Sequence, residues 1–114
     1  MSVKLTNRQV GDVTVIDAVG RITLGEGAST FRDRVRELAA SGRKKLLLNL
    51  ADVSYIDSSG IGELVSGFTT LANQGGTLKL LNLTKRVKDL LQITKLYTVF
   101  EVHEDEAAAV RSFS

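Results

Sequence analysis

The chain contains no cysteine, no proline and no tryptophan, and it has one histidine, His103. Without cysteine it forms no disulfide and no thiolate metal site, and one histidine leaves too few ligands for zinc. A serine–histidine–aspartate triad would need His103 beside Ser58 or Ser59, and no G-x-S-x-G elbow supports that arrangement. A lone histidine at the end of an element is typical of a surface or capping position, so we expect no metal, no cofactor and no catalytic residue.

Long hydrophobic runs are also missing. No apolar run approaches the roughly 18–20 residues that a membrane span needs, and the first residues, MSVKLTNRQVGDV, are too polar for a secretory signal. The formal net charge is +2, the basic residues are scattered among acidic ones, and the few aromatic residues are not interleaved with them. We therefore expect a cytoplasmic protein with no direct nucleic-acid binding and no membrane insertion.

The order of predicted elements indicates an α/β fold in one domain, residues 1–114. A tight-turn signal at Gly11-Asp12 predicts an N-terminal hairpin, and the later strands alternate with helices, which implies parallel pairing. We expect a mixed sheet of about five strands with about four helices. Apolar periodicity places strands at 3–9, 12–19, 45–50, 77–82 and 97–102, and helices at 28–41, 58–73, 85–93 and 105–112.

One stretch, KLLLNLADVSYIDSSGIG, carries most of the functional signal. It predicts a buried strand, a short polar crossing and a helix that begins at Ser58. Asp57 or Ser58 is a natural N-cap, but a cap accounts for one residue and does not require Asp-Ser-Ser-Gly in a row. Gly60 in the first turn lowers helix stability relative to alanine. We interpret Gly60 as leaving room for the close approach of another molecule.

The start of a helix suits a negative charge, because its first backbone N–H groups are unpaired and its dipole end is positive. A phosphate on Ser58 would add a charge of roughly −1.5 to −2 and three acceptor oxygens. The helix start can accommodate this group without refolding. The domain would keep its shape and change its surface, as a binding switch requires.

Two other interpretations of the polar segments remain open. Asp52 and Asp57 follow the buried strand, where α/β sheets place ligands, but two carboxylates alone do not specify acid–base catalysis. The segment 20–27, GRITLGEG, is rich in glycine, yet its spacing matches neither GxxxxGK[ST] nor GxGxxG. We favour a sharply turning connection over a nucleotide loop there.

The segment DVSYIDSSGIGEL, following the strand LLLNL, resembles the signature of the STAS family, and of bacterial anti-sigma-factor antagonists in particular. The resemblance covers essentially the whole chain, with GRITLGEGASTFRDRV in the place of the family's Gly-rich loop and helix. GGTLKLLNL stands in the place of its next strand. This resemblance implies a mixed sheet with helices packed against it.

The resemblance also implies a partner-switching mechanism. The unphosphorylated antagonist binds an anti-sigma factor that is also a serine kinase, and the kinase uses its own ATP to phosphorylate the antagonist and end the complex. A PP2C-type phosphatase restores the serine. The antagonist is a substrate and a binder, not an enzyme.

By this resemblance Ser58 is the phosphoacceptor, and Asp57, Ser59 and Gly60 lie around it. The loop that holds Thr23 and Gly25 borders the partner-binding surface. Thr23 stands where many members carry the aspartate of a Leu-Asp pair, which bears on partner choice.

Two alternatives to the switch follow from the same sequence. The chain could be a STAS subunit that is not phosphorylated, as in a stressosome-like scaffold or a lipid-transport ABC complex. It could also bind a small molecule or act as an enzyme, and that hypothesis expects a deep pocket beside Asp57.

Overall fold

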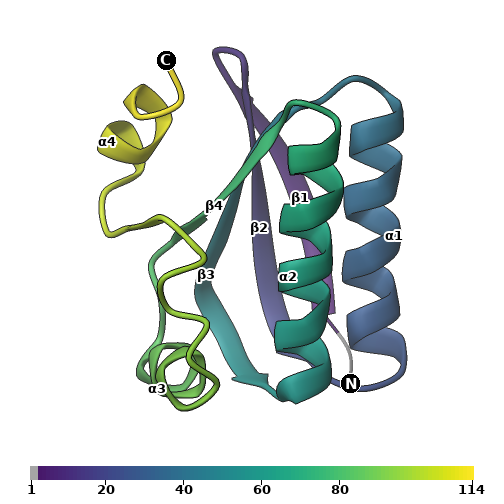
Figure 1. The fold of residues 1–114 in the computed structure, drawn as a ribbon, viewed down its shortest axis with the longest axis vertical. Coiled ribbons are helices and arrows are strands. Elements are labelled where there is room, and N and C mark those ends of the chain that lie inside the picture. The colour runs from purple at the N-terminus through teal and green to yellow at the C-terminus, as the bar shows by residue number, and fades with distance from the viewer. Residues whose placement is uncertain (1–2) are drawn as a thin grey trace.

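The sheet runs through the middle of the molecule, with its strands in sequential order from β1 to β5 (Figure 1). The structure, a computed structural model, describes residues 3–114. β1 is antiparallel to β2, and every other neighbouring pair is parallel, which confirms the predicted mixed sheet. In chain order the elements are β1 (Val3–Val10), β2 (Val13–Ile22), α1 (Glu26–Ala40), β3 (Lys45–Ile56), α2 (Ser58–Asn73), β4 (Thr77–Leu81), α3 (Lys85–Ile93), β5 (Val102–His103) and α4 (Glu106–Arg111).

Helices α1 and α2 cover one face of the sheet, as Figure 1 shows on its right-hand side. Each helix turns an apolar stripe toward the strands, at the 3.6-residue period that the sequence displays. The main core lies between this helix pair and the sheet. Its buried side chains include Phe31, Val35 and Leu38 of α1, Ile61, Leu64 and Leu71 of α2, and Leu46, Leu48 and Leu50 of β3.

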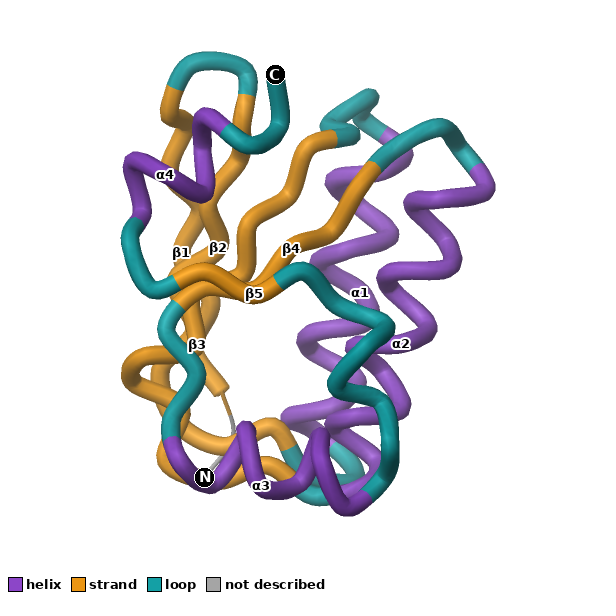
Figure 2. The backbone as a smooth tube through the Cα atoms, turned by 60° about the vertical axis from the view of Figure 1, so that its left-hand side comes forward, coloured by secondary structure: helices purple, strands orange, loops and turns teal. Residues whose placement is uncertain are grey.

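Helix α4 lies against the opposite face of the sheet (Figure 2). Its Ala109 is buried in a second, smaller cluster with Leu47 of β3 and Leu81 of β4. Successive side chains of a strand point to opposite faces of the sheet, so Leu46 and Leu48 pack in the main core while Leu47 packs in the smaller cluster. β3 is therefore covered on both sides, as its unbroken leucine run predicts.

A buried lysine fastens the C-terminal helix to the sheet. Lys79 of β4 is only 7% exposed, and its Nζ donates to the backbone O of Ser112 at 2.9 Å and to its Oγ at 2.8 Å. The same Nζ pairs with Glu101 Oε2 at 2.9 Å and lies 4.6 Å from the ring centroid of Phe113. The hydrogen bond from Lys79 and, second, the contact with His103 outweigh burial and lower the pKa of Glu101 from 4.5 to about 2.

Two strands extend further than the sequence predicts. β2 continues to Ile22 and β3 to Ile56, so residues 51–56, expected to be a polar crossing, belong to the strand. The two strand ends pair with each other, and Ile22 lies opposite Ile56 with both side chains fully buried. This pairing joins residues far apart in sequence and overrides the local polarity. Helix α1 also begins earlier than expected, at Glu26 instead of residue 28.

The prediction of a strand at 97–102 is wrong, because only Val102–His103 pair with β4. The preceding residues form turns after α3, in which Leu96 N–H donates to Leu91 O and Val99 N–H to Leu96 O. Phe100 is buried, with its ring edge-on to Phe68 at a centroid distance of 5.6 Å. Phe100 therefore fills the core and Val99 packs against it, while Tyr97 and Thr98 are exposed.

The Glu101–Lys79 pair makes stability depend on acid pH. Because folding lowers the pKa of Glu101, its contribution is present above the unfolded value near 4.5 and is lost as pH falls toward about 2. We expect the free energy of unfolding of Glu101→Gln to change less with pH across this window than that of the wild type. Denaturant titrations at a series of pH values would measure this. Glu37→Gln, on the exposed side of α1, is the control and should follow the wild-type curve.

Candidate functional site

The candidate site lies at the edge of the sheet where β2 and β3 end and α1 and α2 begin, at the bottom of Figure 1. The two parallel strands finish side by side, and Asp57 N–H donates to Ile22 O at 3.4 Å. Residues 23–25 connect β2 to α1, and Asp57 alone separates β3 from α2. The carboxyl ends of parallel strands meet here, as they do at ligand sites of α/β sheets. We call residues 23–25 and 57–59 the helix-start site.

Asp57 joins the two connections of this site. It is the N-cap of α2, where its Oδ1 accepts from Gly60 N–H at 2.9 Å, and its Oδ2 accepts from Leu24 N–H at 3.0 Å. Burial alone would raise the pKa of the Asp57 carboxyl. The backbone N–H donors, first Leu24 and then Gly60, outweigh burial and hold this pKa below its usual range. Each oxygen is engaged by the chain's own backbone, so Asp57 positions the site and is poorly suited to acid–base catalysis.

Ser58 is the first residue of α2, and its side chain is exposed. Ser59, the next residue, is half-buried. Ser58 is therefore an exposed residue on a helix end that Asp57 has already capped. A macromolecule can reach this hydroxyl without any part of the described chain moving away.

The interpretation of Gly60 as room for another molecule is wrong. Gly60 is buried, and a Cβ built on it would lie 2.1 Å from Ile22 O and 2.7 Å from Ile56 Cγ1. The close approach that this glycine permits is that of the end of β2. Gly60 thus supports the helix-start site from behind and does not belong to its surface.

The loop from β2 to α1 places one apolar side chain on the surface. Thr23 is half-buried and its carbonyl accepts from Ala28 N–H at 2.9 Å, while Gly25 is exposed with φ of 94°, a conformation that favours glycine. Between them the side chain of Leu24 is 79% exposed. Sequence reasoning missed Leu24, although a large apolar residue between threonine and glycine in a Gly-rich loop was the available signal.

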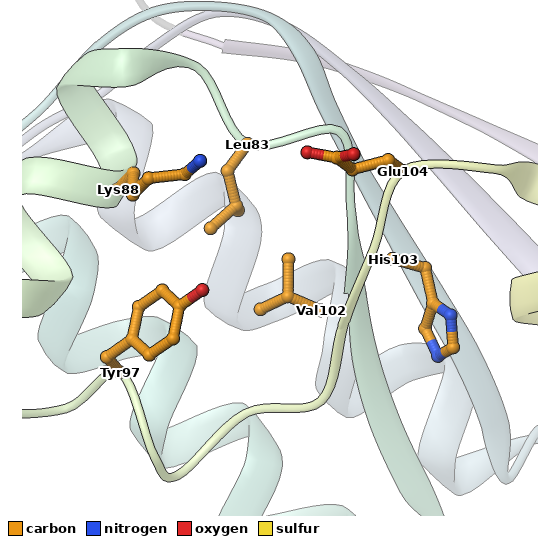
Figure 3. A pocket seen from close by; sticks show the side chains of 6 residues that line it. All are labelled: Leu83, Lys88, Tyr97, Val102, His103 and Glu104. Carbon is orange, nitrogen blue, oxygen red and sulfur yellow. The ribbon is translucent and has the colours of Figure 1, made fainter.

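The pocket in Figure 3 lies between α3 and β5, away from the helix-start site, and has a volume of about 360 Å³. Neither Asp57 nor Ser58 lines this pocket. The hypothesis of a small-molecule function at this helix start requires a pocket beside Asp57, and the pocket in Figure 3 is not such a pocket. The lining residues are Leu83, Lys88, Tyr97, Val102, His103 and Glu104.

The residues named in the catalytic alternatives lie on different elements. His103 lies in β5, where its Nε2 is 2.6 Å from Glu101 Oε2, and the N-cap of α4 is Asp105. Asp52 is exposed on β3. Within residues 3–114 no group of three or more histidine, aspartate or glutamate side chains is arranged to hold a metal ion. Across the same residues, no helix combines the length and apolar character needed to cross a membrane.

The fold and the site together define an α/β domain whose candidate functional feature is an exposed, capped helix start. The STAS domain family model matches residues 4–109, and the chain belongs to this family. The chain is 32% identical to the anti-sigma-B factor antagonist of Bacillus subtilis over 111 residues, which cover 97% of this chain and 100% of that protein. The resemblance inferred from the DSSG-centred segment is thus confirmed.

Solved structures show the same fold. A crystal structure from Thermotoga maritima aligns with a TM-score of 0.88 at 24% identity and covers 96% of this chain and 93% of its own. The Bacillus cell fate determinant SpoIIAA in its phosphorylated form aligns with a TM-score of 0.76 at 19% identity, over 97% of this chain and all of SpoIIAA. These likenesses confirm the STAS-like architecture.

Two glycines of α2 provide a matched test of how the site is supported. We expect Gly60→Ala to lower the free energy of unfolding by about 3 kcal/mol, because its Cβ meets the backbone of β2. Gly62 is exposed, and no atom lies within 4 Å of the position that a Cβ would take there. Gly62→Ala should therefore raise stability by up to about 1 kcal/mol through helix propensity. Chemical denaturation measures both, and equal effects would contradict this packing role of Gly60.

Proposed function

We propose that the chain is an anti-sigma-factor antagonist whose partner binding is switched by phosphorylation of Ser58. The observation that carries this proposal is the exposed Ser58 hydroxyl on a helix end that Asp57 caps and ties to the neighbouring loop. In the unphosphorylated state the protein binds an anti-sigma factor that is also a serine kinase, and so frees a sigma factor. We place this exchange in the cytoplasm, where the kinase has ATP.

In the proposed reaction the chain is the substrate. Ser58 Oγ attacks the γ-phosphorus of the kinase-bound ATP, its proton passes to a base of the kinase, and ADP leaves. The phosphate adds a charge of roughly −1.5 to −2 to the start of α2. The positive end of the helix dipole favours this charge, so the fold is retained.

The same charge disrupts an interface built on this surface. The ionised Asp57 is adjacent, and the exposed Leu24 side chain makes the surface partly apolar, so the interface would bury the phosphate against a like charge and an apolar group. The complex dissociates, and a PP2C-type phosphatase hydrolyses the serine ester to restore binding.

The comparisons support this proposal by analogy. The relative that the chain matches over nearly its whole length bears the name anti-sigma-B factor antagonist. SpoIIAA, which shares the fold at 19% identity, has been solved in both its unphosphorylated and its phosphorylated form. We propose that Asp57, Ser59, Thr23 and Gly25 lie in the partner interface, and that Thr23, in place of the aspartate common in the family, contributes to partner choice.

Variants of Ser58 test the switch. We expect Ser58→Ala to bind the kinase and resist phosphorylation, and Ser58→Asp to bind at least about tenfold more weakly, because its charge sits in the interface. The matched control Ser66→Ala, at an exposed serine further along α2, should be phosphorylated and released like the wild type. Binding titrations with the co-purified kinase, and mass spectrometry of the peptide that carries residue 58 after incubation with ATP, provide the readouts.

A negative outcome is equally definite. The switch would be contradicted if the peptide that carries Ser58 stays unmodified after treatment with a kinase shown to be active. Equal binding by Ser58→Ala and Ser58→Asp would also contradict it. Co-purification from the native host tests the alternative. If it recovers an ABC ATPase or a scaffold assembly in place of a kinase, the hypothesis of an unphosphorylated STAS subunit is favoured.

Leu24 provides a second test of where the partner binds. Burial of one leucine side chain contributes about 1.5–3 kcal/mol, so Leu24→Ser should weaken kinase binding by about tenfold or more. Ile93 at the end of α3 is similarly exposed, at 76%, and Ile93→Ser is the control. If both serine variants bind as tightly as the wild type, Leu24 lies outside the interface.

A further inference from the structure

Two arginines and a tyrosine form a cluster beside the helix-start site, and the proposed switch does not use them. The guanidinium carbon of Arg21 lies 5.0 Å from the ring centroid of Tyr55, and that of Arg86 lies 4.2 Å from the same centroid. Both distances are within the range of cation–π contacts. We call Arg21, Tyr55 and Arg86 the arginine cluster.

Strand pairing, not chance contact, brings the first two members together. Gly20 pairs with Val53, but Arg21 pairs with Tyr55, so β3 carries one extra residue, Ser54, at this point. The Oγ of Ser54 donates to Gly20 O at 3.2 Å. Such a bulge redirects the side chains that follow it and is common beside functional sites. The cluster therefore stands just before the two connections of the helix-start site.

The third member comes from another element. Arg86 lies in the first turn of α3, at the same lower end of the molecule as the start of α2 (Figure 1). Its neighbour Lys85 is neutralised by Asp89, with 2.8 Å between Nζ and Oδ2. Three elements, β2, β3 and α3, thus contribute to one exposed positive surface.

The charge of the arginine cluster is not balanced within the described chain. Across residues 3–114, neither Arg21 nor Arg86 lies within 4.0 Å of a carboxylate oxygen. Both guanidinium groups lie near one ring, so they are within about 10 Å of each other, roughly a Debye length, and repel. An anionic group bound near both of them would relieve this repulsion.

We propose that the arginine cluster is the docking surface for an acidic segment of the anti-sigma factor kinase that engages Ser58. This inference rests on the proposed function and adds the chemistry of the partner. A guanidinium presents N–H donors in a fixed fork that matches a carboxylate. Stacking on Tyr55 already restricts both arginine side chains, so less conformational entropy is lost when carboxylates bind.

The cluster also strengthens the effect of phosphorylation. Ser58 follows Tyr55 by three positions, so their Cα atoms are at most about 11 Å apart. A phosphate on Ser58 would add negative charge at the same end of β3 as the cluster and partly offset the positive charge that attracts the acidic segment. Phosphorylation then weakens the partner's electrostatic attraction as well as blocking the contact at Ser58.

The test reverses the charges of Arg21 and Arg86 and compares the change in association rate with that caused by reversing the charge of an arginine far from the cluster. We expect the double variant Arg21→Glu, Arg86→Glu to associate with the co-purified kinase about tenfold or more slowly at low salt, with the difference shrinking at high salt. Arg111→Glu is the matched control, because Arg111 is exposed on α4, at the opposite end of the molecule in Figure 1. It should associate within about twofold of the wild-type rate.

A second double variant separates charge from structure. Arg21→Lys, Arg86→Lys keeps both charges and should retain the association rate within about threefold. If the kinase binds and phosphorylates the wild type while the glutamate double variant associates like Arg111→Glu, the docking inference is overturned and the proposed switch stands. Equal losses in the lysine and glutamate variants, with a lowered melting temperature in both, would also overturn it. If the kinase neither binds nor phosphorylates the wild type, the proposed switch fails and the inference fails with it.

Discussion

The carboxylate of Asp57 is the contact on which the helix-start site depends. One oxygen accepts from the first turn of α2 and the other from the loop that precedes α1, so a single side chain holds two connections that are 33 residues apart in sequence. Removal of this group would release Leu24 N–H and leave the helix without its cap. The positions of Ser58 and of the exposed Leu24 side chain both follow from this one anion.

Packing behind the site imposes the second constraint. The end of β2 approaches α2 so closely that only glycine fits at position 60, and the fully buried Ile22 and Ile56 fill the space beneath. The helix-start site therefore rests on a core that has little freedom to adjust. A charge added at Ser58 acts on a surface whose underlying backbone is already fixed.

Local patterns in the sequence predict much of this structure, and contacts distant in sequence account for the parts they miss. Period and turn signals predict the hairpin, the alternation of strands and helices, and a cap at Asp57 or Ser58, because each of these is a local preference. The full length of β3 and the hydrogen bond from Leu24 N–H to Asp57 depend on pairing with β2, which no local window contains. Residues 97–100 resemble a strand because strand formers are also good core residues, and Phe100 takes the second role.

The capped start of α2 has a consequence for how long the proposed regulatory state lasts. A switch that works by refolding relaxes at the rate at which its conformations interconvert. Here the backbone around Ser58 is fixed by Asp57 and Gly60 in advance, so the proposed state would be held in a phosphoester bond and not in a conformation. The lifetime of that state would then be set by the abundance of the phosphatase that removes the phosphate.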